Sequence, residues 1–340
     1  MLNSTLKLFF TAAVALSING CSSKNKKPDL PAEVDYLKSK DASIVLSQGY
    51  NRGAVFSDEG DKIFYISRDR KGHKNTQIHE YDLTLQADRR LTFQDGDVFS
   101  VIPLNEEQII YASNTDEIKE QPFAGESNKT YPKAELYLSD LYGSDISRLT
   151  NSVGFDGEMI QVPVRKSLLF TSTRSGTPGL FWLDLQTDKI QVFAHDKVKP
   201  QRSAALSFDG KSLYWIEEDP SAKSNAIVTS DLSGKKRKVV LTLKGAVNSL
   251  LSARNGLIIY SWQPQGADYS HLDIFDPEKV CTQTLLKTKL NFSEPQFSIK
   301  NPSLILVRVS NNDKSQVYRW QMPVDLGPCN EQGPSDTLKK

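Results

Sequence analysis

The sequence contains few of the residues that most often build reactive centres. Its 340 residues include only three cysteines and four histidines, and no G-x-S-x-G motif occurs. Without that motif we do not expect a serine hydrolase whose nucleophile follows a strand at a sharp turn. The formal net charge is +1, so the composition gives no electrostatic footprint for nucleic-acid binding. These absences argue against two large functional classes.

The N-terminal region carries the signals of export. Lys7 precedes an apolar run at residues 8–16, which is shorter than the roughly 20 residues that cross a bilayer, and Gly20 precedes Cys21. This order is typical of a signal peptide over residues 1–20. The residues around Cys21 also resemble the bacterial lipobox, which implies lipid modification of Cys21. An ordinary secretory signal peptide is the alternative.

The residues after Cys21 predict which membrane the protein is attached to and how it is tethered there. Ser22 resembles the corresponding residue of lipoproteins that are sorted to the outer membrane. Residues 21–41 contain the polar, proline-bearing segment SSKNKKPDLP directly after Cys21, which predicts a semi-extended tether. We therefore expect a lipoprotein of the outer membrane that faces the periplasm and contacts the membrane only through its lipid anchor.

Residues 167–185, SLLFTSTRSGTPGLFWLDL, predict a β-hairpin. Two runs rich in aromatic and aliphatic residues flank Gly176, Pro178 and Gly179, which favour a turn. Apolar residues occupy both alternating sets of positions in each run, so both faces of the hairpin need to be covered.

This hairpin is repeated along the chain. The aromatic residue Phe170 has counterparts at intervals of 45 to 59 residues, with Val307 in the sixth copy: Tyr65, Tyr111, Trp215 and Tyr260. An aspartate ends the second strand in five copies: Asp82, Asp140, Asp184, Asp231 and Asp276. A turn and a short strand flank the hairpin, so one repeat corresponds to four strands. Repeated four-stranded units with two apolar faces predict a β-propeller.

The segments FSDEGDKIFYISRDR, LSFDGKSLYW and LLFTSTRSGTPGLFWLDL resemble the PD40, or WD40-like, repeats of the TolB-like propeller family. We therefore expect an all-β fold over residues 42–323, a β-propeller of six four-stranded antiparallel blades. Residues 42–49 match a fourth strand, whereas the last copy supplies only three. The N-terminal strand is thus predicted to close the ring, and residues 324–340 are expected to be a polar tail.

Candidate binding residues fall in the loops predicted for one face of the propeller, the top face. It carries the connections between the second and third strands of each blade and those between blades. A long insertion at residues 114–133 belongs to it, with a disordered excursion as the alternative interpretation. Aromatic and arginine side chains often anchor partners, so the candidates are Phe123, Tyr131, Arg174, Trp262 and Tyr269. The family resemblance implies that the partner is another envelope protein.

Two further sets of residues are not expected to be catalytic. The strand-end aspartates should accept hydrogen bonds from their own turns. His73, His195 and His271 fall in top-face connections of alternate blades, too far apart for one metal ion. No metal, cofactor or catalytic residue is therefore expected. The alternative is a metal-dependent lyase or a sugar-binding propeller that uses the channel mouth.

Cys281 and Cys329 are the cysteines that remain if Cys21 carries lipid. Export to an oxidising compartment permits a disulfide, and both are expected on the bottom face of adjacent blades. We therefore predict that they pair.

Overall fold

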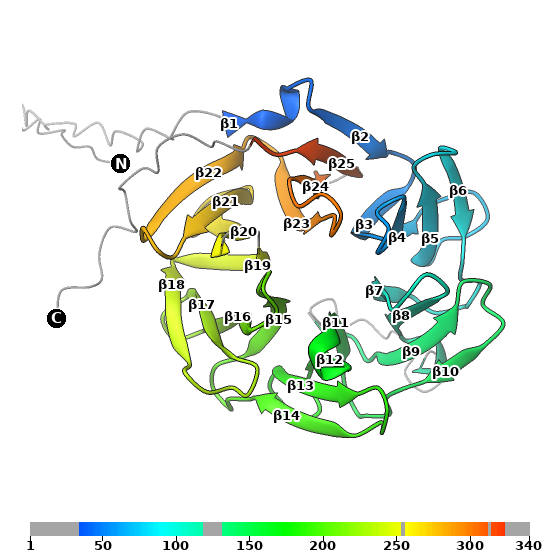
Figure 1. The fold of residues 1–340 in the computed structure, drawn as a ribbon, viewed down its shortest axis with the longest axis horizontal. Helices are drawn as coiled ribbons and strands as arrows, with labels where there is room; N and C mark the ends of the chain where they lie inside the picture. Colours follow the sequence, from blue (N-terminus) through cyan, green and yellow to red (C-terminus); the bar gives the residue numbers. More distant parts are fainter. Residues whose placement is uncertain (1–33, 118–130, 253–255, 312–313, 324–340) are drawn as a thin grey trace, which may run out of the picture. The chain divides into compact units, whose positions relative to one another are not determined.

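The structure is a computed structural model that describes residues 34–117, 131–252, 256–311 and 314–323 (Figure 1). The chain divides into two compact units, Met1–Ala32 and Glu33–Lys340, and every described residue belongs to the second. The predicted signal peptide, Cys21, Phe123 and Cys329 lie outside the described residues. No helix among the described residues is long and apolar enough to cross a membrane.

The first three repeats each contain four consecutive antiparallel strands, from the centre of the ring to its rim. Repeat 1 contains β3 (Tyr50–Phe56), β4 (Lys62–Arg68), β5 (Gln77–Asp82) and β6 (Ala87–Arg90). Repeat 2 contains β7 (Val98–Pro103), β8 (Gln108–Ser113), β9 (Glu135–Asp140) and β10 (Ile146–Arg148). Repeat 3 contains β11 (Asp156–Val162), β12 (Ser167–Ser172), β13 (Gly179–Asp184) and β14 (Ile190–Ala194).

The remaining repeats continue the same order. Repeat 4 contains β15 (Gln201–Leu206), β16 (Ser212–Asp219), β17 (Ser224–Asp231) and β18 (Lys238–Leu243). Repeat 5 contains β19 (Gly245–Ser252), β20 (Ile258–Pro264), β21 (His271–Asp276) and β22 (Cys281–Lys287). Repeat 6 contains β23 (Asn291–Phe297), β24 (Leu304–Ser310), β25 (Ser315–Gln321) and, from the N-terminal end, β2 (Ala42–Leu46). The short 3₁₀ helices are η1 (Tyr36–Lys38), η2 (Thr115–Glu117) and η3 (Pro163–Arg165).

Hydrogen bonding groups these strands into five sheets, so the predicted number of six separate blades is not confirmed. Repeats 2, 3 and 4 are four-stranded sheets, and β1 adds a fifth strand to repeat 5. Repeats 6 and 1 share one eight-stranded sheet because Ser315 of β25 pairs in parallel with Tyr50 of β3. The prediction of an all-β propeller with four-stranded antiparallel units is confirmed.

The N-terminal strand closes the ring, as predicted. β2 pairs antiparallel with β25. Leu46 is buried, but Ile44 is 47% exposed, so closure relies on backbone pairing more than the apolar sequence suggested. Residues 34–38 were expected to belong to the tether. They instead form β1 (Val34–Asp35), which pairs with β22, and η1.

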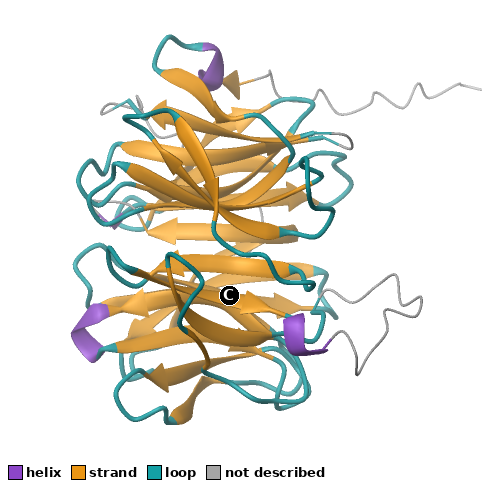
Figure 2. Cartoon of the chain, turned by 90° about the vertical axis from the view of Figure 1, so that its right-hand side faces the viewer, coloured by secondary structure: helices purple, strands orange, loops and turns teal. Residues whose placement is uncertain are grey.

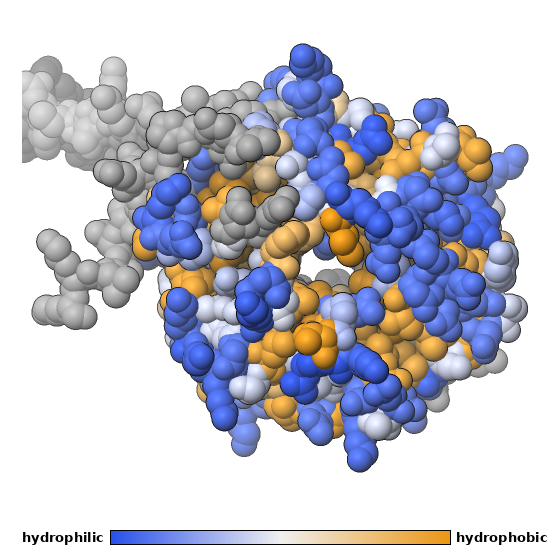
Figure 3. Space-filling view, viewed as in Figure 1, coloured by the Kyte–Doolittle hydropathy of each residue, from blue (hydrophilic) through white to orange (hydrophobic). Residues whose placement is uncertain are grey.

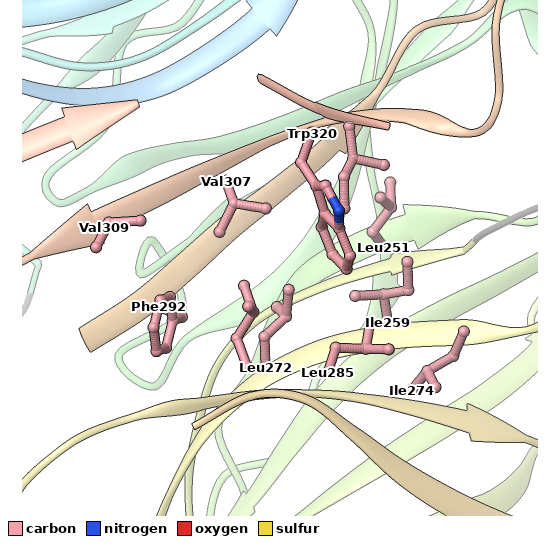
Figure 4. Close-up of a cluster of buried hydrophobic side chains, with 11 residues drawn as sticks. Leu251, Ile259, Leu272, Ile274, Leu285, Phe292, Val307, Val309 and Trp320 are labelled. Atoms are coloured by element: carbon pink, nitrogen blue, oxygen red, sulfur yellow. The ribbon is translucent and has the colours of Figure 1, made fainter. Parts of the chain in front are cut away.

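Apolar side chains pack between neighbouring repeats. Figure 4 shows the cluster between repeats 5 and 6, in which Trp320 of β25 lies near Leu251 and Ile259. All six residues of β12 are buried, as its two-sided apolar pattern predicted. Each fully buried large apolar side chain contributes roughly 1.5–3 kcal/mol. Neighbouring repeats therefore stabilise one another and hold the inner strands in place.

The strand-end aspartates have the predicted structural role. Asp184 accepts hydrogen bonds from the backbone N–H groups of Gln186 and Thr187, both at 2.9 Å, and these bonds lower its pKa. The other four bind their turns in the same way: Asp82, Asp140, Asp231 and Asp276. The aspartate series therefore stabilises turns between third and fourth strands.

Candidate binding face and central channel

The innermost strands of the repeats face the centre of the ring (Figure 1). Residues of β3, β7, β11, β15, β19 and β23 line a cavity of about 300 Å³ within it, and Figure 3 shows the opening at the centre of the ring. The loops gather on two opposite faces (Figure 2). The top face carries the connections between second and third strands and between repeats, and the bottom face carries the other turns.

Every inner strand has a β-bulge where it passes the cavity. The register between the first and second strands shifts in all six repeats. Four bulge residues have φ angles between 45° and 59°: Gly53, Glu158, Ser203 and Glu294. For residues other than glycine this conformation costs about 1 kcal/mol or more, and bulges redirect side chains. The cavity is lined by these redirected residues.

Glu294 connects repeat 6 to repeat 1 in the channel wall. One carboxylate oxygen accepts a hydrogen bond from the N–H of Gly53 at 2.5 Å, and the other accepts from Arg308 at 2.9 Å. Arg52 donates to the carbonyl of Val98 in repeat 2 at 3.0 Å, and burial lowers its pKa. These charged groups therefore join neighbouring repeats.

A second group of the same kind lies halfway around the ring. Glu158 of repeat 3 accepts a hydrogen bond from the hydroxyl of Ser203 in repeat 4 at 2.9 Å. Arg202 donates to the carbonyl of Val247 in repeat 5 at 2.6 Å. Both groups use a glutamate to bind the next repeat and an arginine to reach the repeat after it. The charges in the channel wall are thus engaged with protein partners.

Aromatic rings meet at both ends of the channel. On the bottom face, Phe208 lies 6.1 Å from Phe297 between ring centroids, although repeat 5 separates their repeats. On the top face, Tyr131 packs on Phe155 at 5.3 Å, and Phe155 lies 6.4 Å from Phe99, which lines the cavity. Burial raises the pKa of Tyr131. The structure therefore places this predicted binding residue, half-buried, at the top mouth.

Arg174 is bound within its own repeat. Its Nη2 lies 2.6 Å from the carboxylate of Asp156, which is fully buried, and its guanidinium lies over the rings of Phe170 and Phe181. Removing Arg174 would leave a buried carboxylate without its cation. Partner binding by Arg174 stays a prediction, and the structure adds a stabilising role that the sequence analysis missed.

Trp262 is also engaged inside its repeat. Its Nε1 donates to Asp273 at 2.6 Å, and its ring packs against the apolar cluster between repeats 4 and 5. Tyr269 is half-buried in the top-face loop after β20. Tyr131 and Tyr269 are therefore the described candidates whose removal leaves no buried charge unpaired.

The three top-face histidines have different surroundings. His195 Nε2 lies 3.0 Å from the hydroxyl of Thr177, and His73 Nε2 lies 3.2 Å from Nε2 of His79. Burial lowers the pKa of His271 to about 4. In the part of the chain that the structure describes, no group of three or more His, Cys, Asp or Glu side chains could hold a metal ion.

Three exposed apolar residues on the top face were missed by the sequence analysis. Phe93, Val153 and Val198 are 74%, 88% and 71% exposed, and they lie in three successive connections between repeats. Their exposure could have been predicted from their position outside the strands, because the alternation of apolar and polar residues predicts burial only within strands.

Cys281 is buried and disulfide-bonded. Its partner lies outside the described residues, so the pairing with Cys329 stays a prediction.

A family model for the PD40 repeat, described as the TolB beta propeller domain, matches residues 123–301, which is more than half of the chain. The chain belongs to the PD40 family of TolB-type β-propellers. No curated protein matches it significantly.

Solved structures share the PD40 propeller fold at low sequence identity. TolB from Acinetobacter baumannii has a TM-score of 0.59 and 19% identity, over 74% of this chain and 58% of that chain. An oligogalacturonate lyase in complex with manganese has values of 0.56 and 14%, over 81% and 78%. A puromycin hydrolase has 0.54 and 14%, over 78% and 44%. The chain thus spans less than two thirds of that TolB, and these similarities show the fold alone.

Proposed function

We propose that this PD40 propeller is a non-catalytic, lipid-anchored protein of the bacterial outer membrane that faces the periplasm and binds another envelope protein through its top face. The observation that carries the proposal is the set of exposed apolar side chains Phe93, Val153 and Val198, on the face that also carries the contact between Tyr131 and Phe155. Protein interfaces are enriched in aromatic side chains, and binding sites often lie in loops on a rigid scaffold.

The charged side chains of the channel wall argue against a catalytic function. Its glutamates and arginines hold neighbouring repeats together, so they are poorly placed to act on a substrate. Membership of a TolB-type family supports a location in the envelope. The lipid anchor and the outer-membrane location rest on the sequence around Cys21.

The test compares two double variants with matched exposure. Phe93→Ala with Val198→Ala alters the top face, where the side chains are 74% and 71% exposed. Leu85→Ala with Val164→Ala alters bottom-face turns at the same 74% and 71%. Both should fold like the wild type. In crosslinking and pull-down from a solubilised envelope fraction, we expect the top-face variant to weaken capture about fivefold or more, as loss of interface anchors does.

Variants of two predicted binding residues are tested in the same pull-down experiment. Tyr131→Ala and Tyr269→Ala should add to the loss, because neither leaves a buried charge unpaired. Equal capture by the top-face and bottom-face variants would reject the proposed face. Cys21→Ser, followed by palmitate labelling and fractionation, tests the anchor separately: labelling that persists in this variant contradicts lipidation at Cys21.

The lyase alternative is favoured by one observation, the fold similarity to the lyase in complex with manganese. Calorimetric titration of the full chain with manganese distinguishes it from protein binding. We expect no specific binding. Tight binding that is lost on replacing His73, His195 and His271 together would favour the lyase instead.

A further inference from the structure

Two histidines, His73 and His79, meet near the top face of repeat 1. His73 is half-buried in the connection between β4 and β5, and His79 is buried in β5. Their Nε2 atoms are 3.2 Å apart and their ring centroids 5.3 Å apart, so the rings meet at their Nε2 edges. We call these two residues the histidine pair.

The other ring nitrogen of each histidine lies against a hydrogen-bond acceptor. Nδ1 of His73 lies 2.8 Å from the backbone carbonyl of Asn75, and Nδ1 of His79 lies 2.9 Å from the carboxylate of Asp88. A carbonyl or an ionised carboxylate only accepts, so both Nδ1 atoms carry a proton. In neutral rings both Nε2 atoms are then unprotonated. Two lone pairs therefore face each other, and a cation between them removes their repulsion.

The distance between the two Nε2 atoms fits two ligands of one zinc ion. Zinc binds histidine nitrogens at about 2.0–2.1 Å in tetrahedral geometry, which places two such nitrogens about 3.3–3.4 Å apart. At the same bond lengths, ligands at right angles are only about 2.8–3.0 Å apart. The observed 3.2 Å is close to the tetrahedral value and lies at the long end of the range for hydrogen bonds from N–H groups, about 2.7–3.2 Å.

The groups behind the histidine pair are those that commonly orient metal ligands. Metal-binding histidines usually donate their second N–H to a carboxylate or a backbone carbonyl. Asp88 is itself fixed by the hydroxyl of Tyr65 and by Nη1 of Arg70 at 2.8 Å. The side chain of Asn75 donates to the carbonyl of Asp95 in the connection to repeat 2. Both acceptors are therefore held in place.

We propose that His73 and His79 bind one zinc ion, with water supplying its other two ligands. Imidazole suits zinc, whereas magnesium and manganese prefer oxygen ligands, and half-buried His73 leaves a side open to solvent. With two protein ligands, this site differs from a group of three or more. It is also independent of the proposed binding of an envelope protein.

The surrounding charges set the expected affinity. The positive charges of Arg90 and Arg70 act on His73, and Asp88 balances Arg70 at 2.8 Å. Because Arg90 repels a second cation and only two ligands come from the protein, we expect weaker binding than at four-ligand structural sites, with a Kd of about 10 µM.

Calorimetric titration of the full chain, without an affinity tag and near neutral pH, measures this binding. One zinc ion should bind per chain, and manganese should bind about 100-fold more weakly or less, as the order of metal affinities predicts. Absence of saturable zinc binding below about 1 mM overturns the proposal. Equal affinity for zinc and manganese overturns it as well, because oxygen ligands would then dominate the site.

Two histidine variants provide a matched control. His73 and His195 are both half-buried in top-face connections, but Nε2 of His195 lies 3.0 Å from the hydroxyl of Thr177. His73→Ala should weaken zinc binding by at least the roughly 10–100-fold that the loss of an outer-shell partner costs. His195→Ala should leave it unchanged. Wild-type affinity in His73→Ala overturns the assignment.

The ring nitrogens of the ¹⁵N-labelled full chain distinguish a zinc ion from a shared proton. The four histidines are assigned with single variants. Zinc should shift the Nε2 signals of His73 and His79 and leave both Nδ1 atoms protonated. A proton on Nε2 of either residue that persists in excess zinc overturns the proposal, because the proton then occupies the place of the metal.

Discussion

Repeats 1 and 4 have an aromatic residue at the same position, but different side chains surround it. Tyr65 in β4 pairs across to His79 in β5, and Trp215 in β16 pairs across to Val228 in β17. Both aromatic residues belong to clusters shared with the preceding repeat. The strand framework is therefore the same, and the difference lies in the side chains.

In repeat 1 a polar network fills the space around the aromatic residue. The Tyr65 hydroxyl donates to Asp88 and accepts from Arg70 at 2.7 Å, and Asp88 also interacts with Nδ1 of His79 at 2.9 Å. Burial alone would raise the pKa of Asp88, but the hydrogen bonds from His79 and Tyr65 and the charge of Arg70 lower it to about 2.

In repeat 4 a cavity of about 510 Å³ lies beside Trp215 and Arg237. Val228 stands where repeat 1 has His79, and by the same register Arg237 stands where repeat 1 has Asp88. Val228 offers no polar atom, and Arg237 is a donor like the indole N–H of Trp215. Repeat 1 thus supplies partners for the polar atom of its aromatic residue from its own side chains, whereas the indole N–H of Trp215 has no partner among the described residues.

The largest expected effect comes from removing the acceptor of the repeat 1 network. Asp88→Ala leaves Tyr65, His79 and Arg70 without their shared carboxylate, and we expect a loss of about 3 kcal/mol in the free energy of unfolding. Denaturant unfolding at pH 7 measures it. Arg237→Ala is the matched change in repeat 4 and should cost less, about 1–2 kcal/mol, because Arg237 is 45% exposed and the buried carboxylate of Glu217 keeps its hydrogen bond from Gln201.

The effect of Asp88→Ala should also depend on pH in a defined direction. The pKa of Asp88 is lowered from 3.8 to about 2 in the folded state. Its stabilising contribution is therefore present above pH 3.8 and is lost as the pH falls through 2. A difference between wild type and variant that stays constant down to pH 2, or equal losses in Asp88→Ala and Arg237→Ala, would contradict the comparison.

In repeat 5 an aspartate, Asp273, occupies the position opposite the repeated aromatic residue. Its replacement should have the next largest effect on stability. Asp273 pairs across to Tyr260, as His79 does to Tyr65. Burial raises the pKa of Asp273 from 3.8 to about 6. The folded state thus retains a proton that the unfolded state has lost, and stability falls as the pH rises from about 4 through 6.

Asp273→Asn should remove this loss while keeping an acceptor for the indole N–H of Trp262. We expect the variant to gain up to about 3 kcal/mol at pH 7.5, since one pKa unit corresponds to about 1.4 kcal/mol. The gain should vanish below pH 4. Unfolding measured across this range checks it, and a wild type whose stability is flat between pH 4 and 6 would show that Asp273 ionises normally.

The smallest expected effect on stability comes from removing the hydroxyl group of Tyr65. Tyr65→Phe keeps the ring packing but removes the hydroxyl that joins Asp88 to Arg70, which should cost about 1 kcal/mol. Thermal and denaturant unfolding detect such a loss. A cost as large as that of Asp88→Ala would place the centre of the network at the hydroxyl instead of the carboxylate.

The repeated aromatic positions made the fold predictable, because their spacing reports one structural unit directly. Trp215 and Tyr65 were recognised as equivalent for this reason. The sharing of one sheet by repeats 6 and 1 was not predictable, because it depends on where Ser315 and Tyr50 meet when the ring closes. The pairing of β1 with β22 was likewise hidden, since a two-residue strand has no periodicity.

The sites were less predictable than the fold. The cavity between repeats 3 and 4 is lined by Gln201, Trp215 and Arg237, which come from different parts of repeat 4 and carry no shared sequence pattern. The candidate Arg174 was chosen by residue type, but its partner, the buried carboxylate of Asp156, becomes visible only when β11 and β12 pair. Residue type identifies possible anchors, whereas three-dimensional pairing determines which are already engaged.

The pairing of the N-terminal strands has a mechanical consequence. A pulling force applied to the chain before residue 34 first meets β1, which is held to β22 by only two residue pairs. Leu37, which packs against the cluster between repeats 5 and 6, comes next. The pairs between β2 and β25 follow. β1 therefore acts as a weak first link whose release spares the strand that closes the ring.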